Sequence, residues 1–255
     1  MRETVKRRYQ EVAAEIRDLI AHSDYKPGDR LKTERQMAEE LGVSRSLVRE
    51  AVITLELEGL VDVRKGSGIY LATPPQGIEH NEPRLEDLPD DFGPFELLQA
   101  RQLLESTIAA FAAEMVSMAD IRRMREALDM EREAIEKGTD DGYEADELFH
   151  RLIAVATQNA VLVDLLDELW GKRKKSRMWA QLHTRVFDTD YRRRWLQDHQ
   201  EILQALQKKD AARARQAMWT HLQNVRETLM ELSDVDDPAF DGYVFGSHEL
   251  GRIVG

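Results

Sequence analysis

The chain has 255 residues, of which 42% are hydrophobic and 33% are charged, and its formal net charge at pH 7 is −12. This length is enough for two modest domains, each with its own core. The sequence has no cysteine, which excludes disulfides and thiolate metal ligands. It also has no apolar run of membrane-spanning length and no amino-terminal signal pattern, so we expect a soluble, cytoplasmic protein without a membrane partner.

The acidic charge is distributed unevenly. Residues 1–75 contain equal numbers of basic and acidic residues, so the net charge of −12 falls on residues 76–255. A surface that binds nucleic acid would have to take its positive potential from a local group of basic residues, since the acidic remainder would repel a duplex. The candidates for this group are Lys6, Arg7, Arg8, Arg35, Arg45, Arg49, Arg64 and Lys65.

Residues 29–71 carry the most informative pattern in the chain. Thr33 and Gln36 make a capping box at the start of one helix, and Gly42 permits a tight turn before a second helix that Ser44 can cap. The second helix has an apolar stripe for the core. Four polar residues are predicted to remain on its exposed, amino-terminal side: Ser44, Arg45, Ser46 and Arg49.

Two short strands are predicted after these helices. Residues 61–63 and 69–71 alternate as strands do, and the turn between them, Arg64-Lys65-Gly66-Ser67-Gly68, is basic and rich in glycine. Such a turn suits close approach to phosphates or to a minor groove. A helix-glycine-helix pattern alone occurs in many proteins that never bind nucleic acid. Together with the strand pair it predicts a winged helix-turn-helix DNA-binding domain over residues 1–75.

The stretch from Tyr9 to Leu71 resembles the DNA-binding domain of the GntR superfamily of bacterial repressors. The motifs that carry the resemblance include Glu34-Arg35, Val43-Ser44-Arg45, Val48-Arg49-Glu50-Ala51 and Gly66-Ser67-Gly68. Lys32-Thr33 departs from the family's usual Pro-Ser, although Thr33 keeps the capping hydroxyl. The resemblance implies that Arg35, Arg45 and Arg49 contact bases or phosphates. It also implies that Ser44 and Ser46 help to position the helix and that Gly66 lets the wing enter the minor groove. Together with Lys65 of the basic turn, these are the predicted DNA-binding residues.

The remainder of the chain is predicted to be helical. Residues 76–93 have the composition of a linker, residues 94–233 form an antiparallel all-α bundle, and residues 234–255 form an irregular arm. The expected fold class is therefore mainly α, with an amino-terminal winged helix-turn-helix and a carboxy-terminal helical bundle. Helices are predicted over 95–115, 118–137, 141–157, 160–177, 188–208 and 210–233. In the first of them, Leu97, Leu98, Leu103, Leu104, Ile108 and Phe111 are expected to lie mostly in the core.

Histidines are the feature of the bundle that carries chemistry. Asp146 and His150 stand four residues apart on one predicted helix, and His199 and His221 lie on two later helices. A carboxylate and three imidazoles from facing helices can build one divalent metal site. Spacing alone leaves a second interpretation open, because a histidine on a helix is often an ordinary core or surface residue.

The bundle also resembles the all-α effector domain, called FCD, of the FadR subgroup. The residues that carry this resemblance are Arg101, Glu105, Asp146, His150, Ala156, Asn159, His199 and His221. Many members of the subgroup bind a metal through one aspartate and three histidines. The implied metal ligands are therefore Asp146, His150, His199 and His221. We expect zinc, although nickel, iron and manganese also suit imidazole and carboxylate donors.

Over nearly its whole length the chain resembles the hexuronate-utilisation repressors more closely than the lactate, pyruvate or glycolate regulators of the same subgroup. This implies a transcriptional repressor of sugar-acid catabolism, not an enzyme, that binds a pseudo-palindromic operator as a homodimer and is released by a hexuronate. A sugar carboxylate could bridge the metal and the paired donors of Arg101. The candidate effector-binding residues are Arg101, Arg173, Arg177, Trp179 and Asn224.

Other interpretations remain open from the sequence. The effector could be another small carboxylate, or the metal itself. A metal-dependent enzyme is a further alternative, because an aspartate with three histidines can activate water, but no general base or nucleophile is recognisable beside the ligands. Four of the candidate effector residues have equally good structural interpretations, as core, interface or solvated side chains: Arg173, Arg177, Trp179 and Asn224.

Overall fold

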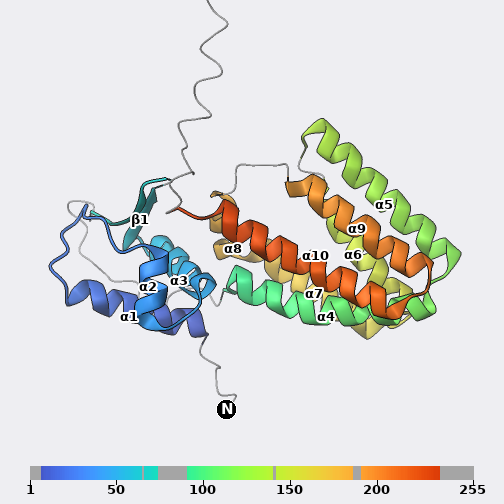
Figure 1. Ribbon diagram of the computed structural model, residues 1–255, viewed down its shortest axis with the longest axis horizontal. Coiled ribbons are helices and arrows are strands. Elements are labelled where there is room, and N and C mark those ends of the chain that lie inside the picture. The colour runs from blue at the N-terminus through green and yellow to red at the C-terminus, as the bar shows by residue number, and fades with distance from the viewer. Residues whose placement is uncertain (1–6, 65, 74–90, 140–141, 186–190, 236–255) are drawn as a thin grey trace, which may run out of the picture. The chain divides into compact units, whose positions relative to one another are not determined.

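The computed structural model describes residues 7–64, 66–73, 91–139, 142–185 and 191–235 (Figure 1). Within these ranges the chain forms ten helices and one two-stranded sheet, which confirms the mainly α fold class. The described residues divide into two compact units. The amino-terminal unit contains the described residues of Met1–Gly93, Arg177–Val186 and Ser233–Gly255. The second unit contains the described residues of Pro94–Ser176 and Phe187–Leu232.

The amino-terminal unit is a winged helix-turn-helix. Its elements are α1 (Arg8–Ala21), α2 (Glu34–Leu41), α3 (Arg45–Leu57), β1 (Val61–Arg64) and β2 (Gly68–Leu71). The strands pair antiparallel, with Val61 opposite Leu71, and Arg30 adds a bridge to Tyr70. The core joins apolar residues of all three helices to Val61 and Ile69 of the hairpin. The strands therefore complete the same core that holds the helix pair.

Local capping sets the start of each helix in the pair. Thr33 accepts a hydrogen bond from the Gln36 backbone while the Gln36 side chain accepts from Thr33, which confirms the capping box. Gly42 has a φ of 65°, a left-handed conformation that favours glycine, and it ends α2. Ser44 then caps α3 by accepting from the Leu47 backbone. The turn and both caps thus fix where α3 begins.

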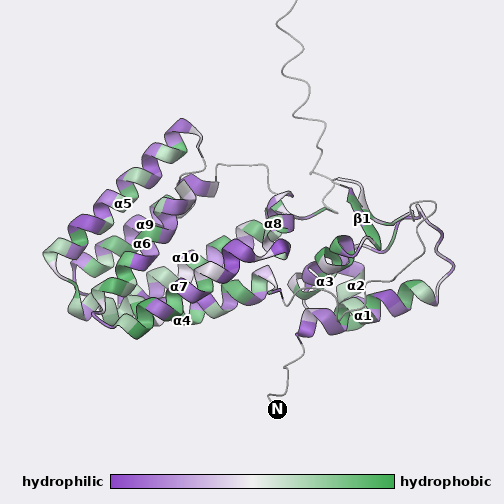
Figure 2. Cartoon of the chain, turned by 180° about the vertical axis from the view of Figure 1, so that it is seen from behind, coloured by the Kyte–Doolittle hydropathy of each residue, from purple (hydrophilic) through white to green (hydrophobic). Residues whose placement is uncertain are grey.

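The second unit is a helical bundle. Its helices are α4 (Pro94–Met115), α5 (Met118–Lys137), α6 (Gly142–Ala156), α7 (Ala160–Lys175), α9 (Tyr191–Gln207) and α10 (Ala211–Leu232). α10 packs against α4 and α9, and α5 packs against α6 and α9. Hydrophilic and hydrophobic residues alternate around these helices (Figure 2), and the large buried side chains include Phe149, Trp170 and Ile202. The six predicted helices are confirmed, although the predicted starts at 141 and 188 lie outside the described residues.

The structure differs from the sequence prediction after residue 175. Ser176 has extended backbone, with φ −72° and ψ 121°, so α7 ends two residues earlier than predicted. A separate short helix, α8 (Arg177–His183), follows and packs against α3 in the amino-terminal unit. Its apolar residues Met178, Trp179 and Leu182 are buried. Burial of this short apolar face explains why a region without a long periodic pattern is helical.

Two residues of α4 correct the predicted core. Leu103 is 57% exposed and Phe111 is 39% exposed, whereas Leu97, Leu98 and Ile108 are buried as expected. α4 carries apolar residues around most of its circumference, so periodicity could not select the buried face. Most of the predicted linker, residues 76–90, and most of the predicted arm, residues 236–255, lie outside the described residues. No helix in the described ranges is long and apolar enough to span a membrane.

Candidate functional site

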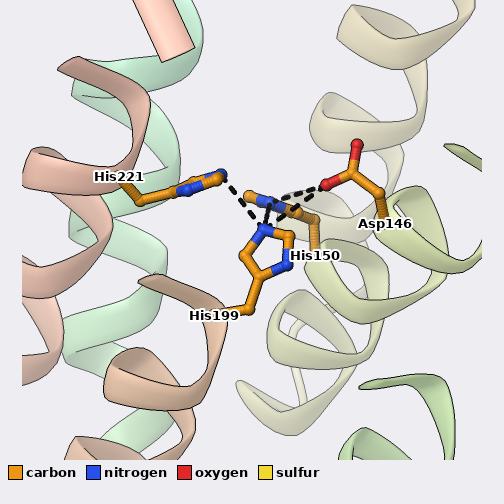
Figure 3. Close-up of side chains that lie close together, drawn as sticks. All are labelled: Asp146, His150, His199 and His221. Carbon is orange, nitrogen blue, oxygen red and sulfur yellow. Dashed lines mark hydrogen bonds and ion pairs between the residues drawn. The ribbon is translucent and has the colours of Figure 1, made fainter. Parts of the chain in front are cut away.

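The four residues predicted as metal ligands come together inside the bundle. Asp146 and His150 project from α6, His199 from α9 and His221 from α10, and their side chains point toward one another (Figure 3). One ligand atom from each residue lies within 4.8 Å of those of the others. The three histidines are at most 2% exposed. The i, i+4 spacing on α6 and the contacts among these helices therefore produce one buried cluster.

The distances within the cluster suit a single cation. Nε2 of His199 lies 3.1 Å from Nε2 of His221, 3.3 Å from Nε2 of His150 and 3.4 Å from Oδ1 of Asp146. Ligands bonded to one metal at about 2.0–2.1 Å are separated from each other by about 3.0–3.4 Å. Lone pairs facing each other this closely would repel without a shared positive charge. The residues present thus fit a divalent metal with one oxygen and three nitrogen donors.

Each histidine is oriented by a carboxylate on its other ring nitrogen. Nδ1 of His150 contacts Glu105, Nδ1 of His199 lies 2.9 Å from Glu131, and Nδ1 of His221 lies 3.4 Å from Asp198. An ionised carboxylate only accepts hydrogen bonds, so Nδ1–H must be the donor in each pair. This tautomer leaves the Nε2 lone pair directed at the centre of the cluster, as in a metal-bound histidine.

The electrostatics favour an ionised Glu105 and a neutral His221, the states that metal binding requires. Burial alone would raise the pKa of Glu105, but the charges of Arg101 and His150 and their hydrogen bonds lower it to about 2. Burial, and then the charge of His199, lower the pKa of His221 to about 3. Burial alone would lower the pKa of His199, but the charge of its carboxylate partner raises it, so a metal would displace a proton there. Ligating groups must be deprotonated carboxylates and neutral imidazoles. At neutral pH, Glu105 is therefore ionised and His221 presents a lone pair.

Three of the five predicted effector-binding residues lie beside this cluster. Arg101 donates from Nε to Glu105, with a distance of 2.6 Å, and NH1 of Arg173 lies 4.0 Å from Oδ2 of Asp146. Asn224 donates to Asp198 over 3.0 Å. The Arg101 and Arg173 guanidinium carbons lie 4.0 and 5.0 Å from the ring centre of Trp170. Two cations, an amide and an indole therefore lie close to the four predicted metal ligands.

The other two predicted effector residues belong to the amino-terminal unit. Arg177 and Trp179 lie on α8, where Trp179 packs against the ring of His183 with a centroid distance of 5.8 Å. Their role in effector binding stays a prediction.

Most residues predicted to contact DNA lie at the surface of the winged helix. Arg35 on α2 and Arg45 at the start of α3 are exposed, Ser44 is exposed and Ser46 is half-buried. Gly66 is exposed in the hairpin turn and has a φ of 62°. Lys65 lies outside the described residues. Arg45 also forms an ion pair with Asp234, with NH2 2.5 Å from Oδ2.

Arg49 corrects the predicted exposed face of α3. Its side chain is 0% exposed, because Nε and NH2 bind the Glu34 carboxylate of α2 at 2.8 and 2.5 Å. NH1 donates to Ser233 over 2.7 Å, and NH2 lies 3.6 Å from Asp234. A position one turn inside the helix faces α2 rather than solvent. In this structure Arg49 links α2 to α3, and its contact with DNA stays a prediction.

Sequence reasoning missed several residues that complete the site. The sequence marks Glu105 only as part of a family pattern, and it indicates no role for Glu131, Asp198 or Trp170. The sequence does contain an indication that Glu131 is buried, since it lies on the same face of α5 as the buried residues Met124 and Leu128. An acid on the apolar face of an amphipathic helix requires a buried partner.

Each of the two parts of the chain matches a known protein family. Residues 8–71 match "Bacterial regulatory proteins, gntR family", and residues 96–224 match the FCD domain. The first match covers the helix pair and the hairpin, and the second covers the helices that carry the candidate metal ligands, up to Asn224.

Curated relatives match over almost the whole chain. The "Uxu operon regulator" of Haemophilus influenzae is 50% identical over 257 residues, covering 100% of this chain and 93% of the relative. The "Uxu operon transcriptional regulator" of Escherichia coli K12 is 49% identical, covering 98% and 97%. The "Exu regulon transcriptional regulator" of the same strain is 40% identical, covering 97% and 95%. The three relatives are named as regulators, not as enzymes.

Proposed function

The chain belongs to the GntR family of bacterial regulatory proteins, with an FCD domain following its winged helix, and from this premise we propose that it represses genes of sugar-acid catabolism. Its effector is a hexuronate that binds at the metal cluster and releases the protein from operator DNA. Relatives named for the Uxu operon, 49–50% identical over 98–100% of this chain, support the hexuronate assignment.

The main support for the proposed effector site is the cluster together with two arginines that lie beside it. Four ligand atoms meet within 4.8 Å, and Arg101 and Arg173 lie against the same group of residues. A metal ion held by these ligands, most simply zinc, would attract the carboxylate and hydroxyl oxygens of a sugar acid. Guanidinium groups bind carboxylates through paired donors, so Arg101 supplies the second attachment for the acid group.

Polar side chains beside the arginines suit the hydroxyl groups of a sugar. The Trp170 indole nitrogen is buried and has no hydrogen-bond partner among the described residues. A buried unpaired donor calls for a ligand or water that satisfies it. Asn224, held by Asp198, offers a second polar group next to His221. These contacts favour a polyhydroxylated acid over a short apolar carboxylate.

DNA release requires that the effector and the operator favour different conformations of the protein. A homodimer holds two winged helices at the spacing of a pseudo-palindromic operator, and each α3 enters a major groove. Hexuronate binding in the bundle favours an arrangement in which the two α3 helices no longer match both half-sites. α10 carries His221 and is followed directly by Ser233 and Asp234, which contact Arg49 and Arg45. The chain therefore connects the two sites covalently at this point.

Exposed apolar residues on α4 and α7 support the homodimer. Leu103, Phe111 and Met115 on α4 are 57%, 39% and 39% exposed, and Val161 and Leu165 on α7 are 65% and 44% exposed. α4 and α7 pack against each other within the bundle. Large apolar side chains left exposed on packed helices favour association with another surface. We assign these residues to contact with a second copy of the chain.

The proposal is tested by operator binding in the presence of uronates. Fluorescence anisotropy with DNA from the promoter region beside the protein's own gene should show specific binding at physiological salt. One member of a panel of galacturonate, glucuronate and fructuronate should lower that affinity at least tenfold, while lactate should not. Specific DNA binding that is indifferent to every uronate would remove the sugar-acid assignment and leave the regulator in place.

Replacing Asp234 with asparagine should strengthen operator binding. In the structure the Asp234 carboxylate holds Arg45, so it competes with DNA for the same guanidinium. An exposed ion pair contributes about 0.2–1 kcal/mol, and two half-sites should together raise the operator affinity about two- to thirtyfold. Anisotropy at fixed salt measures the change. Asp164→Asn, an equal charge change at an exposed position of α7, is the control, and an equal gain in both variants would exclude a specific effect of Asp234.

A further inference from the structure

Three carboxylates that orient the cluster histidines come from three different helices. Glu105 lies on α4, Glu131 on α5 and Asp198 on α9. Each contacts Nδ1 of a histidine that lies on a different helix from the carboxylate itself. Glu105 and Glu131 are 2% and 4% exposed. Such partners fix the ring orientation and raise the basicity of a metal ligand.

The three carboxylates differ in whether they accept a second hydrogen bond besides the one from a histidine. Glu105 also accepts a hydrogen bond from Arg101 through its other oxygen, and Asp198 also accepts one from Asn224. Among the described residues, the interaction found for Glu131 is with His199. Two carboxylates therefore join a metal ligand to a candidate effector-binding side chain, and the third serves a metal ligand alone.

We propose that Glu105 and Asp198 are positioning residues that couple the metal ligands His150 and His221 to the effector contacts Arg101 and Asn224, whereas Glu131 positions His199 alone. The coupling to Arg101 and Asn224 rests on the proposed uronate function, whereas the positioning of the histidines for metal binding does not. Because each shared carboxylate binds both partners at once, movement of Arg101 or Asn224 toward a ligand alters the hydrogen bond that orients the histidine. The uronate site and the metal site are then one hydrogen-bonded unit.

The test compares Glu105→Gln, Asp198→Asn and Glu131→Gln in the full-length protein. Each change keeps the side-chain shape and an acceptor oxygen but removes the negative charge. Competition with a chromogenic chelator should show zinc affinity about 10–100-fold lower in all three variants. The control is Glu133→Gln, a side chain 68% exposed on the same helix as Glu131, which should keep the zinc affinity of the parent.

Calorimetry with the uronate that releases the operator then separates the two roles. At zinc concentrations that saturate every variant, Glu131→Gln should recover the uronate affinity of the parent protein. Glu105→Gln and Asp198→Asn should remain at least about fivefold weaker, because Arg101 and Asn224 have lost the charged acceptors that hold them. Thermal unfolding of the zinc-free proteins distinguishes positioning from a merely structural role, since positioning lowers zinc affinity without a matching loss of the zinc-free melting temperature.

Each outcome decides the inference. Full recovery of uronate binding by Glu105→Gln and Asp198→Asn at saturating zinc would overturn the coupling. Unchanged zinc affinity in Glu131→Gln, or a fall explained by an equal loss of zinc-free stability, would overturn the positioning role. If the parent protein itself bound no uronate at saturating zinc, the proposed function and the coupling would fail together, while the zinc affinities would still decide the positioning role.

Discussion

Replacing His199 with alanine should remove the metal and make the protein unresponsive to uronate while operator binding persists. His199 is the central ligand, since its Nε2 lies within 3.1–3.4 Å of ligand atoms on the three other residues. Loss of an orienting partner alone lowers metal affinity about 10–100-fold, so loss of this ligand should exceed about 100-fold. Elemental analysis after dialysis measures the metal, and anisotropy measures operator binding with and without uronate.

The control for this variant is His22→Ala, which removes an exposed histidine at the end of α1 in the other unit. It should keep both the metal content and the response to uronate. A His199→Ala protein that lost its metal but was still released fully from the operator would show that the effector does not depend on the cluster. Retained operator binding in that variant would exclude misfolding as the explanation.

Replacing Arg45 with alanine should abolish specific operator binding without changing metal content or uronate binding. Arg45 stands at the exposed start of α3, where a recognition helix meets base edges. A bidentate arginine contact with a base contributes about 1–3 kcal/mol of discrimination, so a symmetric dimer should lose about 30-fold or more in affinity. Arg45 is a cleaner test than Arg49, because truncating the buried Arg49 would leave the Glu34 carboxylate without its strongest partner and destabilise the fold.

Arg123→Ala provides the matched control for Arg45. It removes the same charge from a side chain that is 52% exposed on α5 of the bundle, so it should leave operator affinity within about twofold. The salt dependence adds a second measurement. Loss of a phosphate contact weakens binding to all sequences and reduces the salt slope by about one per contact, whereas loss of a base contact relaxes specificity at one position. An Arg45→Ala protein with parental operator affinity would exclude this residue from the interface.

Much of the fold followed from local signals in the sequence. The capping box of Thr33 and Gln36, the left-handed Gly42 and the cap at Ser44 each act within a few residues, so the sequence alone located α2 and α3. α8 was missed because a helix of seven residues gives too short a pattern to recognise, and its burial depends on α3. The side of α4 that is exposed was also unpredictable, since Leu103 is as apolar as its buried neighbours.

The sequence predicted the part of the site in which residues capable of binding a metal recur at helical spacing. Asp146 and His150 share a helix face by spacing, whereas the convergence of His199 and His221 on them depended on family resemblance and then on tertiary packing. The orientation of Arg49 depended on Glu34, fifteen residues away in another helix. The role of Glu131 likewise depends on a partner on a distant helix, which a single sequence does not specify.

The most direct test of a metal-dependent effector site is release of the protein from operator DNA by uronate, measured in the metal-loaded protein, after chelation and after zinc is restored. The cluster of Asp146, His150, His199 and His221 predicts that uronate releases the loaded protein, fails to release the chelated protein, and regains its effect when zinc is added back. Equal release of the loaded and the chelated protein would contradict this account, because the effector would then bind without the metal.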